Sequence, residues 1–134
     1  MSETQQARQT VVYVDDEELA RKYFARSAGG DYEVLLADGA DEAMSILRRE
    51  GARVAVLVTD FRMPGPNGDE LLRQVAREYP HIVRILVTAY ADYGALLEVV
   101  NSGEVFRILE KPLGVSAVRE VLAAATAVPI SRPK

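Results

Sequence analysis

Short runs rich in β-branched residues alternate with amphipathic stretches of helical spacing, five times along the chain. We expect strands over residues 10–14, 32–37, 53–59, 82–87 and 105–109. We expect helices over residues 16–28, 40–50, 71–79, 92–102 and 115–127. Strands that alternate with helices of this length form βαβ units, which build an open parallel sheet with helices on both faces. The pattern therefore predicts a doubly wound α/β fold.

Residues 53–59 (RVAVLVT) are the most apolar of the predicted strands and show almost no polar alternation. Such continuous apolar runs are typical of strands buried on both faces, at the centre of a parallel sheet. Parallel sheets of this kind bind ligands beyond the carboxyl ends of their strands. We therefore expect the functional residues at the strand ends.

Composition limits the function classes. The chain has 134 residues, no cysteine, one histidine and a net charge of −4. We expect one domain over residues 10–127, with disordered tails at 1–9 and 128–134. The absence of cysteine excludes disulfides and thiolate zinc sites. The chain has no basic patch, no signal-peptide core and no apolar run near the ~18 residues of a membrane span, so we expect a cytoplasmic protein without nucleic-acid or membrane contacts.

Chemically useful side chains follow four of the predicted strands. They are Asp15, Asp16, Asp60, Thr88 and Lys111. Each has a plain structural explanation: Asp15 or Asp16 could cap the next helix, and Asp60 could be a turn residue. Because the carboxyl ends of parallel strands share one edge of the sheet, we expect all of these side chains to lie together.

Such a cluster indicates phosphoryl transfer. Three neighbouring carboxylates repel one another unless a cation or a proton neutralises them. Mg²⁺, a hard cation that prefers oxygen ligands, suits them. A carboxylate beside Mg²⁺, a hydroxyl group and a lysine can accept a phosphoryl group as a nucleophile, which forms an aspartyl phosphate.

Four segments resemble the receiver domain of two-component response regulators, the CheY-like superfamily. They are VVYVDDEEL, LVTDFRMPGPNG, LVTAYAD and VFRILEKP, and the similarity runs from about residue 10 to about residue 126. The resemblance implies a flavodoxin-like fold with five parallel strands in the order 2-1-3-4-5. It also implies a phosphoprotein that takes part in phosphorelay signal transduction and is not an enzyme in the ordinary sense, since it catalyses only its own phosphorylation and slow dephosphorylation.

The resemblance assigns the acidic residues. Asp60 matches the phosphorylated aspartate of the family. Asp15 and Asp16 match the pair that binds Mg²⁺ together with Asp60, and the backbone carbonyl of Arg62 completes the protein ligands. Mn²⁺ is an alternative cofactor.

The switch residues follow in the same way. Thr88 matches the hydroxyl residue that moves to the phosphoryl group, and Lys111 the lysine that pairs with it. The bond between Lys111 and Pro112 is expected to be cis. The aromatic residue usual three positions before the lysine is replaced by Ile108. Either Ile108 signals through the backbone, the interpretation that we favour, or Phe106 moves instead, since strand alternation puts both on one face at different depths.

Two further residues are expected to tune the phosphoryl lifetime. Arg62 and Tyr90 each lie two positions after a site residue, and we expect their bulk to restrict the attacking water. His81 is expected to be a surface residue and not a phosphodonor.

Other function classes fit these residues less well than the receiver. A haloacid-dehalogenase-type hydrolase needs an aspartate two residues after its nucleophile, where this chain has Arg62. A flavin or nucleotide module would need a phosphate-binding loop after the first strand, which here is acidic. A receiver-like scaffold that works without phosphorylation remains as an alternative.

The expected partners follow from the resemblance. They are a histidine kinase or phosphotransfer protein, an output domain or protein on the face of helix four, strand five and helix five, and a second copy of the chain in a homodimer. No output module follows Ala127, so the receiver either acts alone or is excised from a hybrid kinase or larger regulator. The run NSGEVFRILEKPL favours excision, because it resembles receivers fused to histidine kinases or phosphodiesterase domains.

Overall fold

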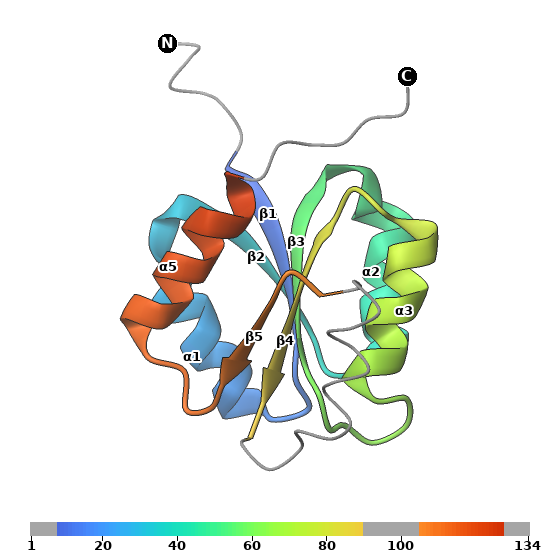
Figure 1. Cartoon of the computed structure of the whole chain (residues 1–134), viewed down its shortest axis with the longest axis horizontal. Helices are drawn as coiled ribbons and strands as arrows, with labels where there is room; N and C mark the ends of the chain where they lie inside the picture. The colour runs from blue at the N-terminus through green and yellow to red at the C-terminus, as the bar shows by residue number, and fades with distance from the viewer. Residues whose placement is uncertain (1–7, 90–104, 128–134) are drawn as a thin grey trace, which may run out of the picture.

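The computed structural model describes residues 8–89 and 105–127, and within them five strands form one parallel sheet (Figure 1). Their order is β2-β1-β3-β4-β5, which confirms the predicted α/β topology. The strands are β1 (Gln9–Val14), β2 (Tyr32–Ala37), β3 (Val54–Asp60), β4 (Val83–Thr88) and β5 (Arg107–Glu110). Since every neighbouring pair is parallel, all the strand ends that carry chemical groups meet at one edge.

Helices cover both faces of this sheet. The described helices are α1 (Glu18–Ala28), α2 (Ala40–Glu50), α3 (Gly68–Glu78) and α5 (Val115–Thr126), with short 3₁₀ turns at Gly29–Asp31 and Gly51–Arg53. α1 and α5 lie on one face and α2 and α3 on the other (Figure 1). The predicted helix over residues 92–102 lies outside the described residues. Within residues 8–89 and 105–127, no helix has both the length and the apolar content that a bilayer span requires.

The hydrophobic core is divided by the sheet into two clusters. Leu47, Leu71 and Leu72 are buried on the side of α2 and α3. On the other side α5 buries the inward positions that its spacing predicts: Val118, Val121, Leu122 and Ala125. β3 runs between the clusters, and five of its side chains have no exposed surface: Val54, Val56, Leu57, Val58 and Thr59. The prediction of a central strand is therefore confirmed.

Several predicted boundaries move by one to three residues, the most at α3, which begins at Gly68 and not at residue 71. Arg53 lies in the 3₁₀ turn before β3 instead of in the strand, because its guanidinium stays at the surface. There it contacts Glu33 and Glu50 at 2.7 Å each and the Thr10 hydroxyl at 2.8 Å. β5 begins at Arg107 and not at residue 105.

The inward face of α1 is not the one that the spacing of its apolar residues indicates. The spacing groups Leu19, Ala20, Tyr23 and Phe24, but Leu19 is 79% exposed and Tyr23 43% exposed. Phe24 is buried and stacks on the ring of Tyr13. Successive residues are about 100° apart around a helix, so Phe24 can face the sheet while Tyr23 turns toward the rim. Gly29 ends the helix with φ 73°, a left-handed conformation that glycine adopts without strain.

Candidate functional site

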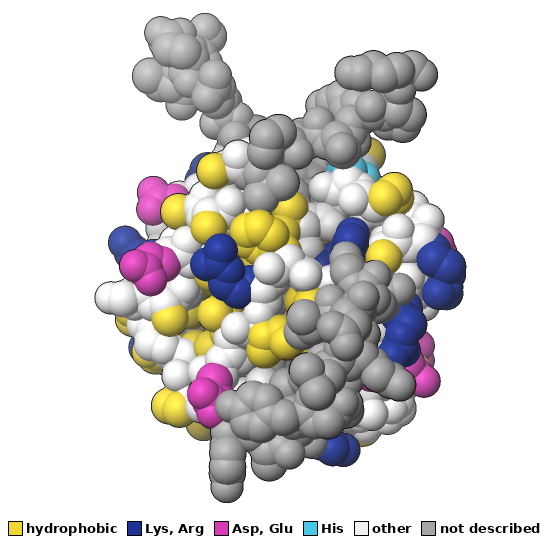
Figure 2. All heavy atoms as spheres, in the orientation of Figure 1, with side chains coloured by type: hydrophobic (Ala, Val, Ile, Leu, Met, Phe, Trp, Pro, Cys, Tyr) yellow, Lys and Arg dark blue, Asp and Glu magenta, His cyan; other side chains and the backbone are white. Residues whose placement is uncertain are grey.

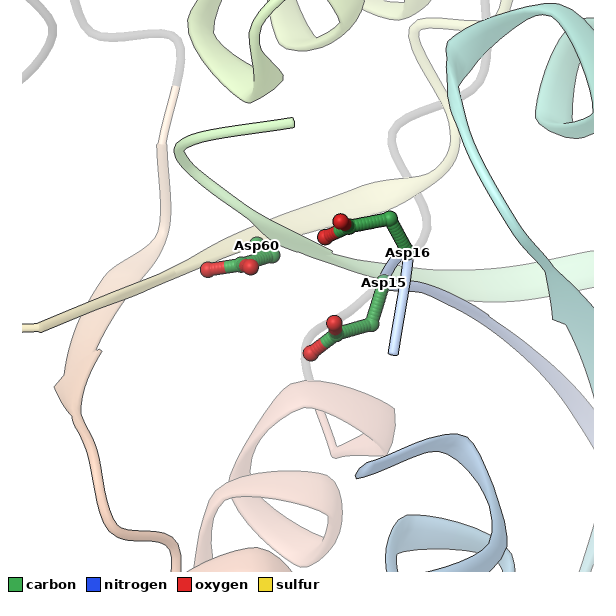
Figure 3. A group of neighbouring side chains, drawn as sticks. All are labelled: Asp15, Asp16 and Asp60. Atoms are coloured by element: carbon green, nitrogen blue, oxygen red, sulfur yellow. The ribbon is translucent and has the colours of Figure 1, made fainter. Parts of the chain in front are cut away.

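Three carboxylates meet at the carboxyl edge of the sheet (Figure 3). Asp15 and Asp16 directly follow β1, and Asp60 is the last residue of β3, the strand beside it. Because the last residue of β1, Val14, pairs with Thr59, the register brings Asp15 next to Asp60. One carboxylate oxygen from each of the three residues lies within 4.8 Å of the others. The sheet thus assembles the predicted acidic cluster.

Asp15 is fully buried and is hydrogen-bonded through both of its carboxylate oxygens. Oδ1 accepts the backbone N–H of Glu17 at 3.0 Å. Oδ2 accepts the Tyr13 hydroxyl at 2.8 Å and the Lys111 ammonium at 3.2 Å. The N-cap of α1 is Glu17, so the simple capping role considered for Asp15 or Asp16 does not describe either residue.

Asp60 is 8% exposed, and its carboxylate also has two partners. The N–H of Phe61 donates to Oδ1 at 3.0 Å and Lys111 Nζ to Oδ2 at 3.2 Å. Burial, and then the charge of Asp15, raise the pKa of Asp60 to about 6, although Lys111 and the Phe61 N–H partly offset them. Asp60 is therefore mostly ionised at pH 7.

Lys111 links two of the carboxylates from the loop after β5. Its ammonium lies 3.2 Å from both Asp15 and Asp60. Burial lowers the pKa of Lys111, but Asp60 and Asp15 more than offset this and the net shift is upward. Lys111 therefore stays charged. The Lys111–Pro112 bond is cis, as the resemblance implies.

Thr88 ends β4 beside the acidic cluster. It directly follows Val87, which pairs with Asp60 across β3 and β4. Its side chain is almost fully buried, and its hydroxyl donates to the carbonyl of Ala89 at 3.0 Å. The Lys111 backbone N–H donates to the Thr88 carbonyl at 2.8 Å, and this hydrogen bond links the end of β4 to the residue that follows β5.

The comparisons with known proteins agree with this geometry. A family model described as "Response regulator receiver domain" matches residues 11–123. The chain belongs to this family. The receiver domain is 36% identical over 103 residues to the hydrogenase transcriptional regulatory protein HoxA of Cupriavidus necator, which is 77% of this chain and 21% of that protein. It is 31% identical over 118 residues to the sensor kinase CckA of Brucella abortus, which is 84% of this chain and 12% of that protein.

A solved structure has the same fold. It is a response regulator receiver domain protein from Clostridium thermocellum, with a TM-score of 0.80 and 25% identity. The match covers 91% of this chain and 95% of the other. The chain spans only a small part of the length of the two curated relatives.

The acidic cluster of the receiver domain fits a hard divalent cation. Asp15, Asp16 and Asp60 offer only oxygen donors, which Mg²⁺ prefers. Three carboxylates and one ammonium carry a formal charge of −2, which a divalent cation balances. Two of the carboxylates are buried, where an unbalanced charge is costly.

The residues predicted to tune or to report phosphorylation are Arg62, Tyr90, Ile108 and Phe106. Arg62 is exposed, and its guanidinium lies over the Phe61 ring at 5.4 Å. Tyr90 lies outside the described residues. Ile108 is half-buried against the hydrophobic core on the side of α2 and α3. Phe106 precedes β5 and is 39% exposed. The two therefore lie at different depths.

His81 is remote from the acidic edge. It lies just before β4, at the amino end of the sheet, and its Nε2 lies 2.8 Å from the carbonyl oxygen of Gly51. This contact joins two loops and gives the histidine a structural role.

The sequence analysis missed two residues at the site. Tyr13 donates its hydroxyl to Asp15, and its position two residues before Asp15 on a strand was the available signal. Gly68 lies so close to Asp60 that an added Cβ would be 2.1 Å from the Asp60 carbonyl oxygen. Only the spacing of Gly68 after the Pro-Gly loop could have indicated this.

Proposed function

We propose that this receiver domain accepts a phosphoryl group on Asp60 from the phosphohistidine of a histidine kinase or phosphotransfer protein. The observation that carries the proposal is the arrangement around Asp60. Its carboxylate lies at the sheet edge with the Lys111 ammonium at 3.2 Å and two further carboxylates within 4.8 Å.

The transfer uses the ionised carboxylate as a nucleophile. An oxygen of Asp60 forms a bond to phosphorus, the P–N bond of the phosphohistidine breaks, and the leaving imidazole nitrogen takes a proton from solvent. Lys111 lies where it can offset negative charge on the phosphoryl oxygens, which is the main task in this chemistry. The receiver is then a signalling acceptor that promotes only its own phosphorylation and slow dephosphorylation.

The cation ligands are the three carboxylates together with the backbone carbonyl of Arg62. Asp15, Asp16 and Asp60 would hold Mg²⁺, or Mn²⁺ in its place. When bound, the cation neutralises charge on the phosphoryl oxygens and orients the donor.

The switch begins at Thr88. We propose that its hydroxyl leaves the Ala89 carbonyl and bonds to the phosphoryl group. The Lys111 N–H bond to the Thr88 carbonyl offers a path from there to β5. Ile108 is half-buried and therefore placed to respond to a change in packing, while Phe106 is the alternative responder.

We propose the output surface on the face of β5, α5 and the predicted helix over residues 92–102, which lies outside the described residues. Figure 2 shows hydrophobic side chains at the surface beside α5 and β5, with Lys or Arg side chains among them. Phe106 is 39% and Val115 45% exposed. An output domain or protein, or a second copy of the chain, would bind here. We place the receiver in the cytoplasm, with no direct role for nucleic acid or membrane.

Intact-mass spectrometry tests the acceptor role. The chain is incubated with acetyl phosphate and Mg²⁺, beside an Asp60→Asn control. We expect a phosphoryl adduct that requires Mg²⁺ and is missing in the variant. An unmodified wild type that nevertheless binds Mg²⁺ would favour a receiver specific for its own phosphohistidine donor or the phosphorylation-independent scaffold.

The lifetime of the adduct tests the tuning residues. We expect Arg62→Ala with Tyr90→Ala to raise the dephosphorylation rate severalfold, because less bulk restricts the attacking water. The rate is followed by the decay of the adduct mass after the donor is removed. An unchanged rate contradicts this role for Arg62 and Tyr90.

A further inference from the structure

Tyr13 is a buried tyrosine of β1 whose hydroxyl is hydrogen-bonded to one carboxylate of the acidic cluster. The residue lies in the middle of the core cluster on the side of α1 and α5, and it is 1% exposed. Its ring belongs to the apolar core beneath those helices, but its hydroxyl donates to Asp15 Oδ2 at 2.8 Å. A phenylalanine could fill the same space, so packing alone does not account for the hydroxyl.

The hydroxyl completes the hydrogen bonding of Asp15. Oδ1 of Asp15 is held by the N–H of Glu17, while Oδ2 is shared between Tyr13 and Lys111. With both oxygens bonded, the carboxylate plane is fixed toward Asp60. Without the hydroxyl, the ammonium of Lys111 would be the remaining side-chain partner of Oδ2 and would draw Asp15 into a closer ion pair.

The hydroxyl also preserves the charge of the site. Being neutral, it satisfies a lone pair of Asp15 without cancelling any of the formal −2 charge of the three carboxylates and Lys111. A cationic side chain at this position would hold Asp15 equally well, but it would leave less negative charge for a divalent cation.

The ring of Tyr13 is itself held in place. It stacks on Phe24 of α1 with the ring centroids 4.1 Å apart and the planes 7° from parallel. The hydroxyl is therefore presented to Asp15 at a fixed position by contacts between β1 and α1.

We propose that Tyr13 is a positioning residue of the cation site, whose hydroxyl orients the Asp15 carboxylate toward Asp16 and Asp60 and limits its pairing with Lys111. The inference rests on the proposed use of these three carboxylates to hold Mg²⁺. Hydrogen-bonded partners behind metal-ligating carboxylates commonly contribute tenfold or more to metal affinity.

Isothermal titration calorimetry of the 134-residue chain with MgCl₂ or MnCl₂ measures the Kd of the cation and tests the proposal. Tyr13→Phe removes the hydroxyl and keeps the ring. We expect its Kd for the cation to rise about tenfold to a hundredfold. Tyr79→Phe is the matched control, because Tyr79 packs against Gly51 at the other end of the sheet, and its Kd should equal that of the wild type.

Tyrosine absorption gives a second readout that a merely structural role would not change. The chain has six tyrosines and no tryptophan, so at the long-wavelength side of the near-ultraviolet, where phenylalanine does not absorb, its difference spectrum reports tyrosine alone. We expect Mg²⁺ to produce a difference signal in the wild type and in Tyr79→Phe, since the cation alters the acceptor of the Tyr13 hydroxyl. The part of the signal that comes from Tyr13 should be missing in Tyr13→Phe, so its signal should be smaller than that of the wild type.

The outcomes separate the two proposals. Wild-type protein that binds neither cation overturns the proposed cation site itself. Wild type that binds, with an equal Kd and an equal difference signal in Tyr13→Phe, overturns only the role of Tyr13. Should Tyr13→Phe fail to fold by circular dichroism, Tyr13→Met takes its place, because a flexible methionine fills the core and also lacks the hydroxyl.

Discussion

At the scale of single residues, Asp60 combines a reactive carboxylate with an unfavourable environment. Its pKa of about 6 lies well above the ordinary value of 3.8, because burial and Asp15 oppose the charged form more than Lys111 favours it. Through linkage, a shift of this size corresponds to a cost on the order of 2–3 kcal/mol in folding free energy at neutral pH. The buried charge of Asp60 therefore lowers the stability of the cation-free receiver, at the position that a cation or a phosphoryl group is proposed to occupy.

Asp60→Asn should stabilise the cation-free domain. Removing the buried charge is expected to raise the free energy of unfolding by about 1–3 kcal/mol at pH 7. The measurement is urea denaturation in EDTA, with Glu120→Gln, at an exposed position in the middle of α5, as the control for the loss of a surface charge.

The pH dependence gives the sign of this effect. A folded-state pKa above the unfolded value means that the folded protein binds the proton more tightly, so the wild type gains stability as the pH falls from about 7 toward 4. The advantage of Asp60→Asn should therefore shrink over that range. A difference that stays constant with pH would contradict the assigned environment of Asp60.

At the scale of elements, the connection between β3 and α3 sets the position of Asp60. The Gly68 N–H donates to the Phe61 carbonyl at 2.7 Å, so the first turn of α3 packs directly beneath the end of β3. This approach leaves no space for a side chain at Gly68, because the nearest atoms belong to the backbone of Asp60 and Phe61.

Gly68→Ala should therefore displace the acceptor strand end. We expect a loss of about 2–4 kcal/mol in the free energy of unfolding and a slower phosphorylation by acetyl phosphate. Gly114→Ala is the matched control, since Gly114 is the N-cap of α5 and an added Cβ there meets nothing within 4 Å. Denaturation by urea measures the first effect and intact mass the second. Equal stability losses in the two variants would show that the close approach to Asp60 does not matter.

At the scale of the whole molecule, the parallel sheet couples distant parts of the chain to one edge. Lys111 contacts both Asp15, which is 96 positions away in the sequence, and Asp60, which is 51 positions away. A change at Asp60 can therefore reach β5 and α5 through Lys111 and the Thr88 carbonyl. The apolar side chains exposed beside these elements are placed to report it.

Phosphorylation should promote a homodimer through this surface. We expect the domain treated with acetyl phosphate and Mg²⁺ to sediment with a higher mass than the untreated domain, and Asp60→Asn to sediment alike in both conditions. Val115→Glu, a change at an exposed position on α5, should keep the phosphoryl adduct and reduce the dimer. Identical masses with and without a confirmed adduct would contradict the dimer.

Much of this molecule was determined by local pattern. The alternation of β-rich and amphipathic runs predicts the parallel sheet, and the parallel sheet brings Asp15, Asp60 and Lys111 to one edge whatever the details of packing. The burial of β3 follows equally from its composition. These predictions succeeded because period and topology depend on which residues follow one another.

Only the tertiary structure decided which neighbours the side chains have. The apolar residues of α1 indicated a face that includes Leu19, yet Phe24 makes the contact, because the ring of Tyr13 on β1 lies opposite it. The Tyr13 hydroxyl on Asp15 and the raised pKa of Asp60 likewise depend on groups brought together from different strands. Hydrogen bonds and desolvation depend on atoms a few ångströms away in space. The packing of the helices on the sheet decides which atoms those are, so the order of residues in the sequence does not determine them.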